Sequence, residues 1–408
     1  MSDTFAIQPT VLAKAVADTV VISVDPSARQ SGIFYWRMGR PWADAVLAAL
    51  EQATDSSVTE AYRSLSSSPT SRRAYLQLQT TLLTRSNDRS IQRILTMAWA
   101  SEQNSRIGYF IGSDYEPSQP LLDLRQLLGY PRRVSSTATS GVVATIAIPF
   151  RDQSTLGSLR LRNLTACLRA LADQSIHRSQ YEVIVVECDD FPRWRSHIEP
   201  IIDRYLFGPK PGTFNRSWGA NCAVTNSPTE APIVCILDAD VLPDHEFVER
   251  NVTRFMAPGT GAHLPYRNMS CLDEASTSWA IDQRVIKATS DPETAGLRGF
   301  NLRRPPGCCI WVRRDIFNRI GGMDERYEGW GGEDNDLVNR LDVVAPIDHY
   351  DDRLLHMYHT PSSELKPDGT LVTSHIEPLS WRPNTPIGNL SKFEATGVPR
   401  QITGVANG

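Results

Sequence analysis

The stretch PIVCILDAD at residues 232–240 places two aspartates directly after a continuous apolar run. A short run of this kind, rich in β-branched residues, is typical of a parallel strand that is buried on both faces. Two similar runs precede it, VVATIAIP at 142–149 and EVIVVE at 182–187. A helical pattern lies between those two, with Leu161, Leu164, Leu168 and Leu171 on one face. The alternation predicts an α/β domain with a mostly parallel central sheet flanked by helices.

Polar residues follow each of the three predicted strands, as Phe150-Arg151-Asp152, Cys188-Asp189-Asp190 and Asp238-Ala239-Asp240. Ligands of such sheets bind at the carboxyl ends of the strands, so we expect the binding site at this edge. Two aspartates at i and i+2 can hold a hard divalent cation and, through it, a diphosphate. The alternative is an ordinary turn with capping acids, before a helix that has Pro243 in its first turn and runs to Phe255.

The segment GWGGEDND at residues 329–336 is the most specific motif in the chain. Its glycines let the backbone bend tightly, and the indole of Trp330 offers a flat surface for a sugar. Neighbouring carboxylates repel one another and raise the pKa of at least one of them, which suits a general base for a hydroxyl nucleophile. The alternative is a solvated turn that opens a helix. We assign Asp336 to that role, at an exposed helix start.

Two histidines, His356 and His359, follow in the run LLHMYH at residues 354–359. Neutral imidazole is a good ligand for a borderline metal such as manganese or zinc. The alternative is a pair of partly buried histidines that only make hydrogen bonds. Because the pair follows both the Asp-x-Asp and the acidic segment, we predict that Asp240, His356 and His359 converge on one cation.

The composition is that of a globular protein and excludes several classes of function. The 408 residues are 41% hydrophobic, with a mean hydropathy of -0.30, a net charge of -4 and an isoelectric point near 6.1. The charge argues against a nucleic-acid binder, and no apolar run approaches the ~20 residues of a membrane span. None of the seven cysteines forms a CxxC pair, so we expect buried, reduced thiols and a cytoplasmic location.

The chain divides into three predicted parts. Residues 1–140 read as mainly helical, with a serine-rich boundary at 135–140; residues 141–360 form the α/β domain; and residues 361–408 are a tail that wraps the domain or is partly loose. Two helical faces are expected in the first part, one with Trp42, Val46, Leu47 and Leu50 and one with Ile91, Ile94, Leu95 and Ala98. We assign this part to packing, acceptor recognition or assembly, including a homo-oligomer, and to no step of the metal–diphosphate chemistry.

Taken together, these residues resemble the GT-A glycosyltransferases of the family 2 or 7 type. The similarity is greatest to the beta-1,4-galactosyltransferase and chondroitin-polymerase branch, and the polypeptide N-acetylgalactosaminyltransferases are more distant. It runs from about Ile146 to His359. It rests on Ile148-Pro149-Phe150-Arg151, Phe214-Asn215-Arg216, Gly219-Ala220-Asn221, Asp238-Ala239-Asp240, the stretch from Pro306-Gly307 to Ile320-Gly321-Gly322, the segment from Trp330 to Asp336, and His359.

The resemblance implies an inverting transferase that moves a sugar from a UDP-sugar to the hydroxyl of a glycan, peptide, lipid-linked or small-molecule acceptor. It implies a divalent metal, Mn²⁺ before Mg²⁺, held by Asp240, His359 and His356. Asp334 would be the general base, and Glu333 would hydrogen-bond a sugar. The implied substrate- and nucleotide-binding residues are Pro149, Phe150, Arg151, Asp189, Arg216, Asp238, Gly307, Trp330, Gly331 and Gly332.

Two positions depart from the galactosyltransferase pattern: Gln153 stands where a second arginine is usual, and His356 where methionine is usual. Three alternative functions stay open. A retaining transferase of the polypeptide N-acetylgalactosaminyltransferase type is disfavoured because its motif carries only the glutamate. A nucleotide-sugar pyrophosphorylase lacks support because no glycine-rich, lysine-containing loop follows the first strand. A noncatalytic sugar-nucleotide-binding protein is disfavoured by the intact acids and histidines.

Overall fold

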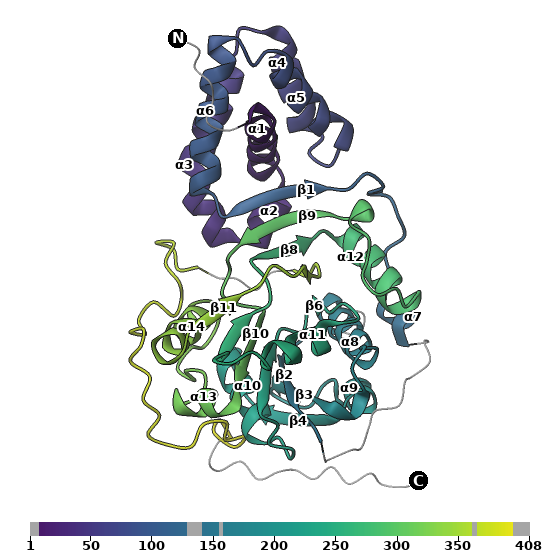
Figure 1. Cartoon of the computed structure of the whole chain (residues 1–408), viewed down its shortest axis with the longest axis vertical. Coiled ribbons are helices and arrows are strands. Elements are labelled where there is room, and N and C mark those ends of the chain that lie inside the picture. Colours follow the sequence, from purple (N-terminus) through teal and green to yellow (C-terminus); the bar gives the residue numbers. More distant parts are fainter. Residues whose placement is uncertain (1–7, 129–140, 155–157, 361–364, 395–408) are drawn as a thin grey trace.

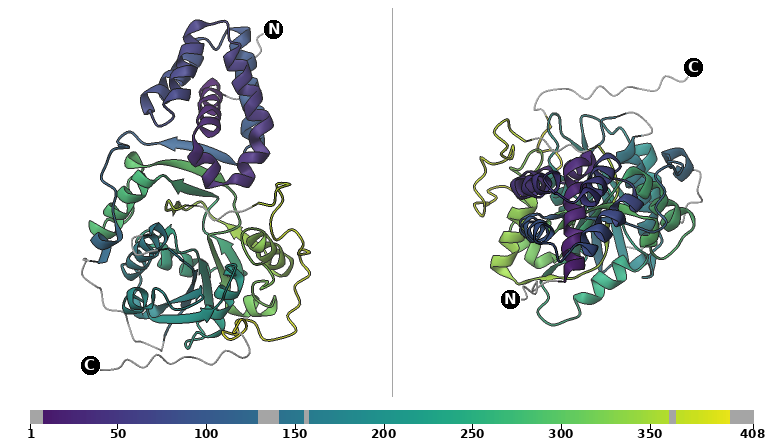
Figure 2. Two further views of the ribbon diagram at one scale, coloured as in Figure 1. Left: turned by 180° about the vertical axis from the view of Figure 1, so that it is seen from behind. Right: turned by 90° about the horizontal axis from the view of Figure 1, so that it is seen from above.

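A computed structural model of the chain describes residues 8–128, 141–154, 158–360 and 365–394 (Figure 1). A helical region stands on one end of an α/β domain that contains two sheets, and the two views of Figure 2 agree on this arrangement. Within the described residues, no helix combines the length and the apolar character that a bilayer crossing requires. The predicted serine-rich boundary at 135–140 lies outside the described residues.

The helical region is built around α1 (Pro9–Val24), which contacts α3 (Ile33–Glu51), α4 (Ser56–Ser67), α5 (Arg72–Thr84) and α6 (Arg89–Asn104) and leads into the short α2 (Pro26–Ser31). Aspartate or serine caps α4, α5 and α6, each accepting a hydrogen bond from a backbone N–H of the first turn. The predicted face of Ile91, Ile94, Leu95 and Ala98 is buried, as expected. On the other predicted face, Val46 and Leu50 are buried, whereas Trp42 is 39% exposed and Ala43 beside it is buried.

The larger sheet carries the three predicted strands at its centre. β2 (Ala144–Phe150) pairs in parallel with β3 (Tyr181–Asp189) and β5 (Ile233–Leu237), and every residue of all three is buried. β4 (Arg204–Pro209) extends the parallel part beyond β3. On the other side β10 (Cys309–Arg313) runs antiparallel to both β5 and β7 (Ala262–Leu264), and β11 (Ile347–His349) closes the edge.

Helices flank this sheet. The predicted leucine face lies in α8 (Leu159–Ala172), where all four leucines are buried. The remaining helices are α7 (Leu124–Leu128), α9 (Arg195–Ile198), α10 (Arg216–Thr225), α11 (Phe247–Arg254), α12 (Glu274–Ile281), α13 (Arg314–Arg319) and α14 (Glu333–Val344). α11 begins at Phe247, so the expected helix with Pro243 in its first turn is wrong. The carbonyls of Pro243 and Asp244 instead accept hydrogen bonds from the side chains of Arg284 and Gln174, so these carbonyls are used outside a helix.

A second sheet joins the helical region to the α/β domain. Its order is β1 (Ile107–Ile111), β9 (Arg298–Arg303), β8 (Asn268–Leu272), β12 (Leu354–His356) and β6 (Val241–Leu242). β1 follows α6 directly and pairs antiparallel with β9, with Ile107 opposite Leu302. At the other edge, β12 pairs with β6, which starts immediately after Asp240. This sheet therefore connects the N-terminal region to the strands that carry the predicted metal ligands.

The segment 365–394 wraps the α/β domain, one of the two outcomes expected for the tail. Trp381 donates its indole N–H to the Gly321 carbonyl at 2.7 Å, and the Trp218 indole donates to the Asn389 carbonyl at 2.9 Å. The ring of Phe393 packs edge-on against Trp218. All seven cysteines are buried and free, as expected for reduced thiols.

Candidate functional site

Asp240, His356 and His359 lie together at the junction of the two sheets. One ligand atom from each lies within 4.8 Å of the others. The Nε2 of His359 is 2.9 Å from Asp240 Oδ2, and the Nε2 of His356 is 3.3 Å from Oδ1. The pairing of His356 opposite Val241 sets this geometry, because it brings β12 beside the residue that follows Asp240. The predicted convergence is present, and the role of the three side chains as metal ligands stays a prediction.

The chemistry of this cluster fits a divalent cation. Asp240 Oδ1 is buried and accepts no hydrogen bond within the described residues. The Nδ1 of His359 lies 2.9 Å from the Thr360 carbonyl, a contact that is satisfied when Nδ1 carries the proton. Nε2 then faces the carboxylate, an arrangement that either a proton on Nε2 or a cation between the two groups would satisfy. Burial lowers the pKa of His356, which favours its neutral, ligating form. One carboxylate and two imidazoles suit manganese or zinc.

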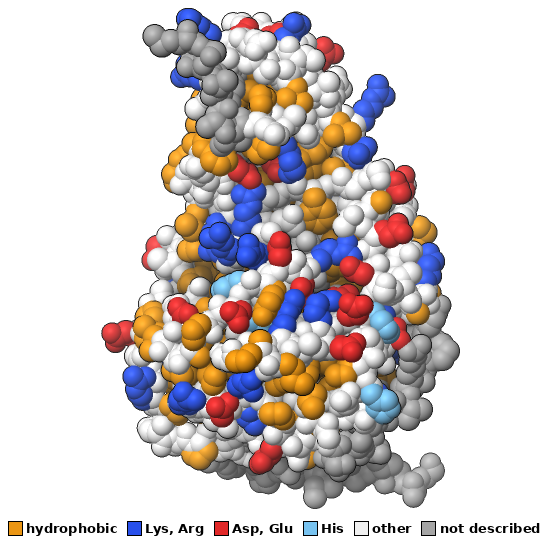
Figure 3. Space-filling view, in the orientation of Figure 1, with side chains coloured by type: hydrophobic (Ala, Val, Ile, Leu, Met, Phe, Trp, Pro, Cys, Tyr) orange, Lys and Arg blue, Asp and Glu red, His pale blue; other side chains and the backbone are white. Residues whose placement is uncertain are grey.

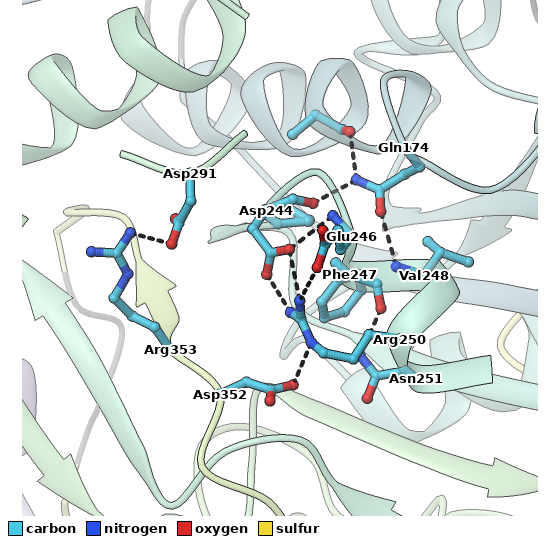
Figure 4. A network of polar contacts seen from close by, with 12 residues as sticks. Gln174, Asp244, Glu246, Phe247, Val248, Arg250, Asn251, Asp291, Asp352 and Arg353 are labelled. Atoms are coloured by element: carbon cyan, nitrogen blue, oxygen red, sulfur yellow. Dashed lines mark hydrogen bonds and ion pairs between the residues drawn. The ribbon is translucent and has the colours of Figure 1, made fainter. Parts of the chain in front are cut away.

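Contacts on either side of β12 fix its position. Asp352, two residues before the strand, accepts hydrogen bonds from Arg250 at 3.0 Å (Figure 4) and from Arg254 at 2.6 Å, both on α11. Beyond the strand, the Asn163 side chain donates to the Tyr358 carbonyl at 3.0 Å. The Met357 N–H donates to the Asp240 carbonyl at 2.8 Å. The two histidines are therefore held from α11, from α8 and from the aspartate loop itself.

Arg216 connects the aspartate loop to the acidic segment. It is the first residue of α10, and the side chain of Asn215 caps that helix by accepting from the Trp218 N–H at 2.8 Å. The guanidinium donates to Asp238 Oδ1 at 2.6 Å and to Asp334 Oδ1 at 2.7 Å. Although burial lowers the pKa of Arg216, the two carboxylates outweigh it and raise that pKa, so the group stays charged. The structure thus brings together three residues that the sequence assigned to one site.

Glu333 and Asp334 begin α14 and face the same region. The chain reaches them through Gly331 and Gly332, with φ of 100° and 98°, values that residues with a Cβ rarely adopt. Burial and then repulsion from Asp334 raise the pKa of Glu333 to about 7, and its Oε2 is buried without a partner in the described chain. Burial also raises the pKa of Asp334, whereas Arg216 opposes that shift.

Gly307 leaves room beside the free oxygen of Asp334. A Cβ at position 307 would lie 2.2 Å from Asp334 Oδ2, so no larger residue fits without moving the acid. Oδ1 is occupied by Arg216, and Oδ2 is the oxygen that faces this space. Asp334 thus has Oδ1 held by Arg216, while Oδ2 packs against Gly307 and forms no hydrogen bond within the described residues.

Asp336 is not an exposed helix-start acid, and the expectation for it is wrong. It is 1% exposed and pairs with the buried Arg340 at 2.7 Å, while its other oxygen accepts from the Leu379 N–H at 3.0 Å. The segment around Leu379 covers this side of α14. Asp336 thus holds the wrapping segment against the helix.

Four of the predicted nucleotide-binding residues, Pro149, Phe150, Arg151 and Asp189, lie at the ends of β2 and β3. Pro149 and Phe150 end β2, and Arg151 follows, with its Nη2 3.9 Å from Asp189 Oδ1. Gln153, the residue that departs from the family pattern, donates to the same Oδ1 at 2.9 Å. The buried Nη1 of Arg151 has no partner in the described residues, which leaves one donor for a ligand.

Sequence reasoning missed two contributors to the site. Arg160 on α8 donates to the Thr360 carbonyl at 3.1 Å. Burial raises the pKa of Asp240, but the two histidines and the charge of Arg160 outweigh it, so the pKa of Asp240 is lowered. Thr373 donates to the Gly331 carbonyl, and Leu371 packs against Gly331, so the wrapping segment supports the glycine loop beside Trp330. A lone arginine in a helix and a featureless tail gave no motif by which to find either.

Two family models match parts of the chain. Residues 146–321 match the glycosyltransferase family 2 model, and residues 300–359 match the model described as the N-terminal domain of galactosyltransferase. No curated protein matches the chain significantly. A mannosyltransferase from Pyrobaculum calidifontis, solved with GDP-Man and Mn²⁺, is similar at 16% identity and a TM-score of 0.35. That alignment covers 60% of this chain and 63% of the mannosyltransferase, less than two thirds of its length.

Proposed function

We propose that the donor is a UDP-sugar and that transfer inverts the anomeric carbon. The premise is that residues 146–321 match glycosyltransferase family 2 and that residues 300–359 match a galactosyltransferase domain. The chain is a glycosyltransferase of the hexosyltransferase kind with an α/β GT-A fold, and its family takes sugars from nucleotide-sugars. The choice of UDP, the stereochemistry and the metal are the parts proposed here.

One observation carries the proposal: Arg216 holds Asp334 and Asp238 by the same guanidinium. Asp238 belongs to the loop that ends in Asp240, so the acid at the start of α14 lies one side chain away from the predicted diphosphate site. A carboxylate in this position can reach an acceptor hydroxyl beside the donor sugar. Such a base is required when the hydroxyl attacks in line from the face opposite the leaving group.

The proposed step uses the free oxygen of Asp334. As the acceptor oxygen forms its bond to the anomeric carbon, Asp334 Oδ2 takes the hydroxyl proton, and the bond from that carbon to UDP breaks with its electron pair going to UDP. Arg216 keeps Asp334 Oδ1 in place during the transfer. Glu333, buried and with an unpartnered oxygen, accepts a hydrogen bond from a sugar hydroxyl.

Asp240, His356 and His359 would hold the divalent cation. A metal ion there would offset the charge of the donor diphosphate and stabilise the departing UDP. Arg151 adds a donor at the end of β2, where its buried Nη1 is unused. Gly307, which has no Cβ, lets Asp334 Oδ2 lie where a larger residue would displace it.

The test uses the purified full chain with a panel of UDP-sugars and Mn²⁺, and it follows UDP release by slow hydrolysis. At least one UDP-sugar is expected to be hydrolysed, and a chelator should stop the reaction. GDP- and TDP-sugars serve as matched donors. Hydrolysis of only a GDP- or TDP-sugar would reject the UDP assignment, and undiminished hydrolysis in chelator would reject the metal.

A further inference from the structure

A group of arginines gathers where the helical region meets the α/β domain. Arg106 begins the chain into β1, Arg303 ends β9 and Arg304 follows it, while Arg267 precedes β8 and Arg37 lies on α3. Figure 3 shows Lys and Arg side chains collected at this waist of the molecule, over the paired ends of β1 and β9. The whole chain carries a net charge of -4, so this gathering does not reflect a generally basic surface.

Two of these arginines, Arg303 and Arg106, make contacts within the chain that explain their positions. Arg303 pairs with Glu102 on α6. Arg106 donates to the Arg303 carbonyl from Nε at 2.9 Å and from Nη2 at 2.7 Å, and its guanidinium lies 4.5 Å from the centre of the Tyr35 ring. These contacts fasten the helical region to the end of β9.

The other three arginines have no acidic partner in the described part of the chain. Arg304, Arg267 and Arg37 are exposed, and none of them forms an ion pair there. The backbone N–H of Arg304 donates to the Arg267 carbonyl at 2.6 Å, so these two residues lie side by side. Arg37 approaches the turn of the wrapping segment, where a Cβ at Gly369 would lie 2.7 Å from its Nη1.

Arg304 and Arg267 each lie near Gly307, the glycine beside Asp334. Arg304 is three residues from Gly307, so the Cα atoms of Arg304 and Gly307 are at most roughly 11 Å apart. Tyr266, the neighbour of Arg267, donates its hydroxyl to the carbonyls of Pro305 and Gly307. Burial and, less strongly, the charge of Asp334 raise the pKa of Tyr35, whereas Arg106 lowers it, so Tyr35 on α3 is within electrostatic range of Asp334.

Arg304 also has a strained backbone. Its φ is 51°, in the left-handed region that residues with a Cβ seldom adopt, and it precedes Pro305, which further restricts it. A strained residue of this kind costs roughly 1–3 kcal/mol and persists where the surroundings fix it, often at a functional site. The hydrogen bond to the Arg267 carbonyl helps to hold the backbone of Arg304 in this conformation. The charged side chain of Arg304 is exposed.

We propose that the acceptor is a saccharide bearing a negative charge, a phosphate, sulfate or carboxylate, and that Arg304 and Arg267 bind this group while the attacking hydroxyl lies beside Asp334. Arg37 contributes from the helical region, which gives α3 a part in acceptor binding. The inference rests on the proposed function and deepens it by naming the acceptor class.

Equilibrium binding to the full chain tests the proposal without knowledge of the natural acceptor. The probes are sucrose octasulfate, a densely charged saccharide, and neutral sucrose, each titrated in the presence of UDP and Mn²⁺. The variant is Arg304→Gln/Arg267→Gln, and its folding is checked by its melting temperature. The matched control is Arg93→Gln, an exposed arginine on α6 that lies 11 residues, or roughly 16 Å, before the end of that helix.

The parent and the control are expected to bind the sulfated probe but not sucrose, and the double variant to bind at least tenfold more weakly. The difference should shrink as salt rises from 50 to about 500 mM, because screening weakens exposed charge pairs. Turnover gives the second measurement. The acceptors are tested as neutral and charged pairs: glucose with glucose 6-phosphate, and methyl glucoside with methyl glucuronide. The parent enzyme should prefer a charged member of a pair, and the double variant should have a higher KM for that acceptor.

Several outcomes would overturn the inference. Absence of binding by the parent, or equal binding by all three proteins, would remove the arginines from acceptor recognition. Binding to phosphatidylglycerol vesicles that is lost in the double variant, without binding of the sulfated saccharide, would assign the surface to a lipid bilayer instead. Hydrolysis of UDP-sugars by the parent separates these results from failure of the proposed function. A parent that hydrolyses no nucleotide-sugar fails at that earlier step.

Discussion

Arg216 donates a hydrogen bond to Asp334 across 2.7 Å and so joins the start of α10 to the start of α14. The two residues are far apart in the sequence, and each stands at the first turn of its helix. The same guanidinium reaches Asp238, which makes the position of the acid depend on the aspartate loop. A change that moves one helix start is therefore expected to move the Asp334 carboxylate relative to Asp238.

Replacing Arg216 by lysine tests this dependence. Lysine keeps the charge but cannot hold both carboxylates with a planar fork. Loss of one charge-assisted hydrogen bond, worth ~1.5–3 kcal/mol, predicts a fall in kcat of roughly 10- to 150-fold in a UDP-release assay. Arg319→Lys on the exposed face of α13 is the control. An Arg216→Lys enzyme with parental kcat would show that the bridge does not position the acid.

The cluster at β12 predicts a specific loss of metal binding. His359→Ala removes one of three ligands, so the dissociation constant for Mn²⁺, measured by calorimetry on the full chain, should rise at least tenfold. His375→Ala is the matched control, because His375 is exposed and lies outside the cluster. Equal Mn²⁺ affinity in the parent and in His359→Ala would remove His359 from the ligand set.

The central sheet could be predicted from the sequence because its strands have a local signature. The strands at 144–150, 181–189 and 233–237 are short apolar runs between turns, and the acids that follow them lie at one edge by the geometry of a parallel sheet. The convergence of Asp240 with His356 and His359 could be predicted from their ligand chemistry and from the order of the motifs along the chain. The pairing that produces it could not be predicted, because no local pattern places β12 beside β6.

The rest depended on contacts between distant segments, which a local pattern does not contain. Asp336 looked like a helix-start acid because the residues that bury it, Arg340 apart, lie more than 40 positions later in the wrapping segment. Trp42 satisfied the helical spacing, yet Ala43 faces the core. The addition of β1 to the sheet of β9 could not be predicted, since it pairs residues almost 200 positions apart. The arginine surface follows from that pairing.

The buried pair of Asp336 and Arg340 makes a prediction about stability. Asp336→Asn leaves Arg340 buried without a counter-charge, which typically costs ~3–5 kcal/mol. The free energy of unfolding in urea should fall by about that amount. Asp342→Asn, an exposed acid on the same helix, should change it by less than ~0.5 kcal/mol. Similar values for the two variants would contradict the buried pairing.

Glu333 predicts a pH dependence of stability. Its pKa is raised from 4.5 to about 7, so between these values the folded chain keeps a proton that the unfolded chain has released. Its contribution to stability is therefore present below pH 4.5 and is lost as the pH rises to 7. At pH 8 and without metal, Glu333→Gln should be more stable than the parent, by at most roughly 3 kcal/mol at ~1.4 kcal/mol per pKa unit. Glu377→Gln, an exposed acid, should leave the pH profile of the melting temperature unchanged, and a parental profile in Glu333→Gln would refute the shift.

Asp334→Asn separates the base from the residues around it. The amide keeps the shape of the side chain and its contact with Arg216 through Oδ1, so UDP and Mn²⁺ should bind nearly as tightly as in the parent. It cannot accept the hydroxyl proton, and transfer should fall by the ~10²–10⁴-fold typical of losing a general base. Glu333→Gln should instead raise KM for a sugar substrate, because a neutral amide accepts a weaker hydrogen bond than a carboxylate. Proton coupling at the anomeric carbon of the product should show inversion relative to the donor. A retained anomer, or an Asp334→Asn enzyme with undiminished turnover, would exclude Asp334 as the base and favour the retaining alternative.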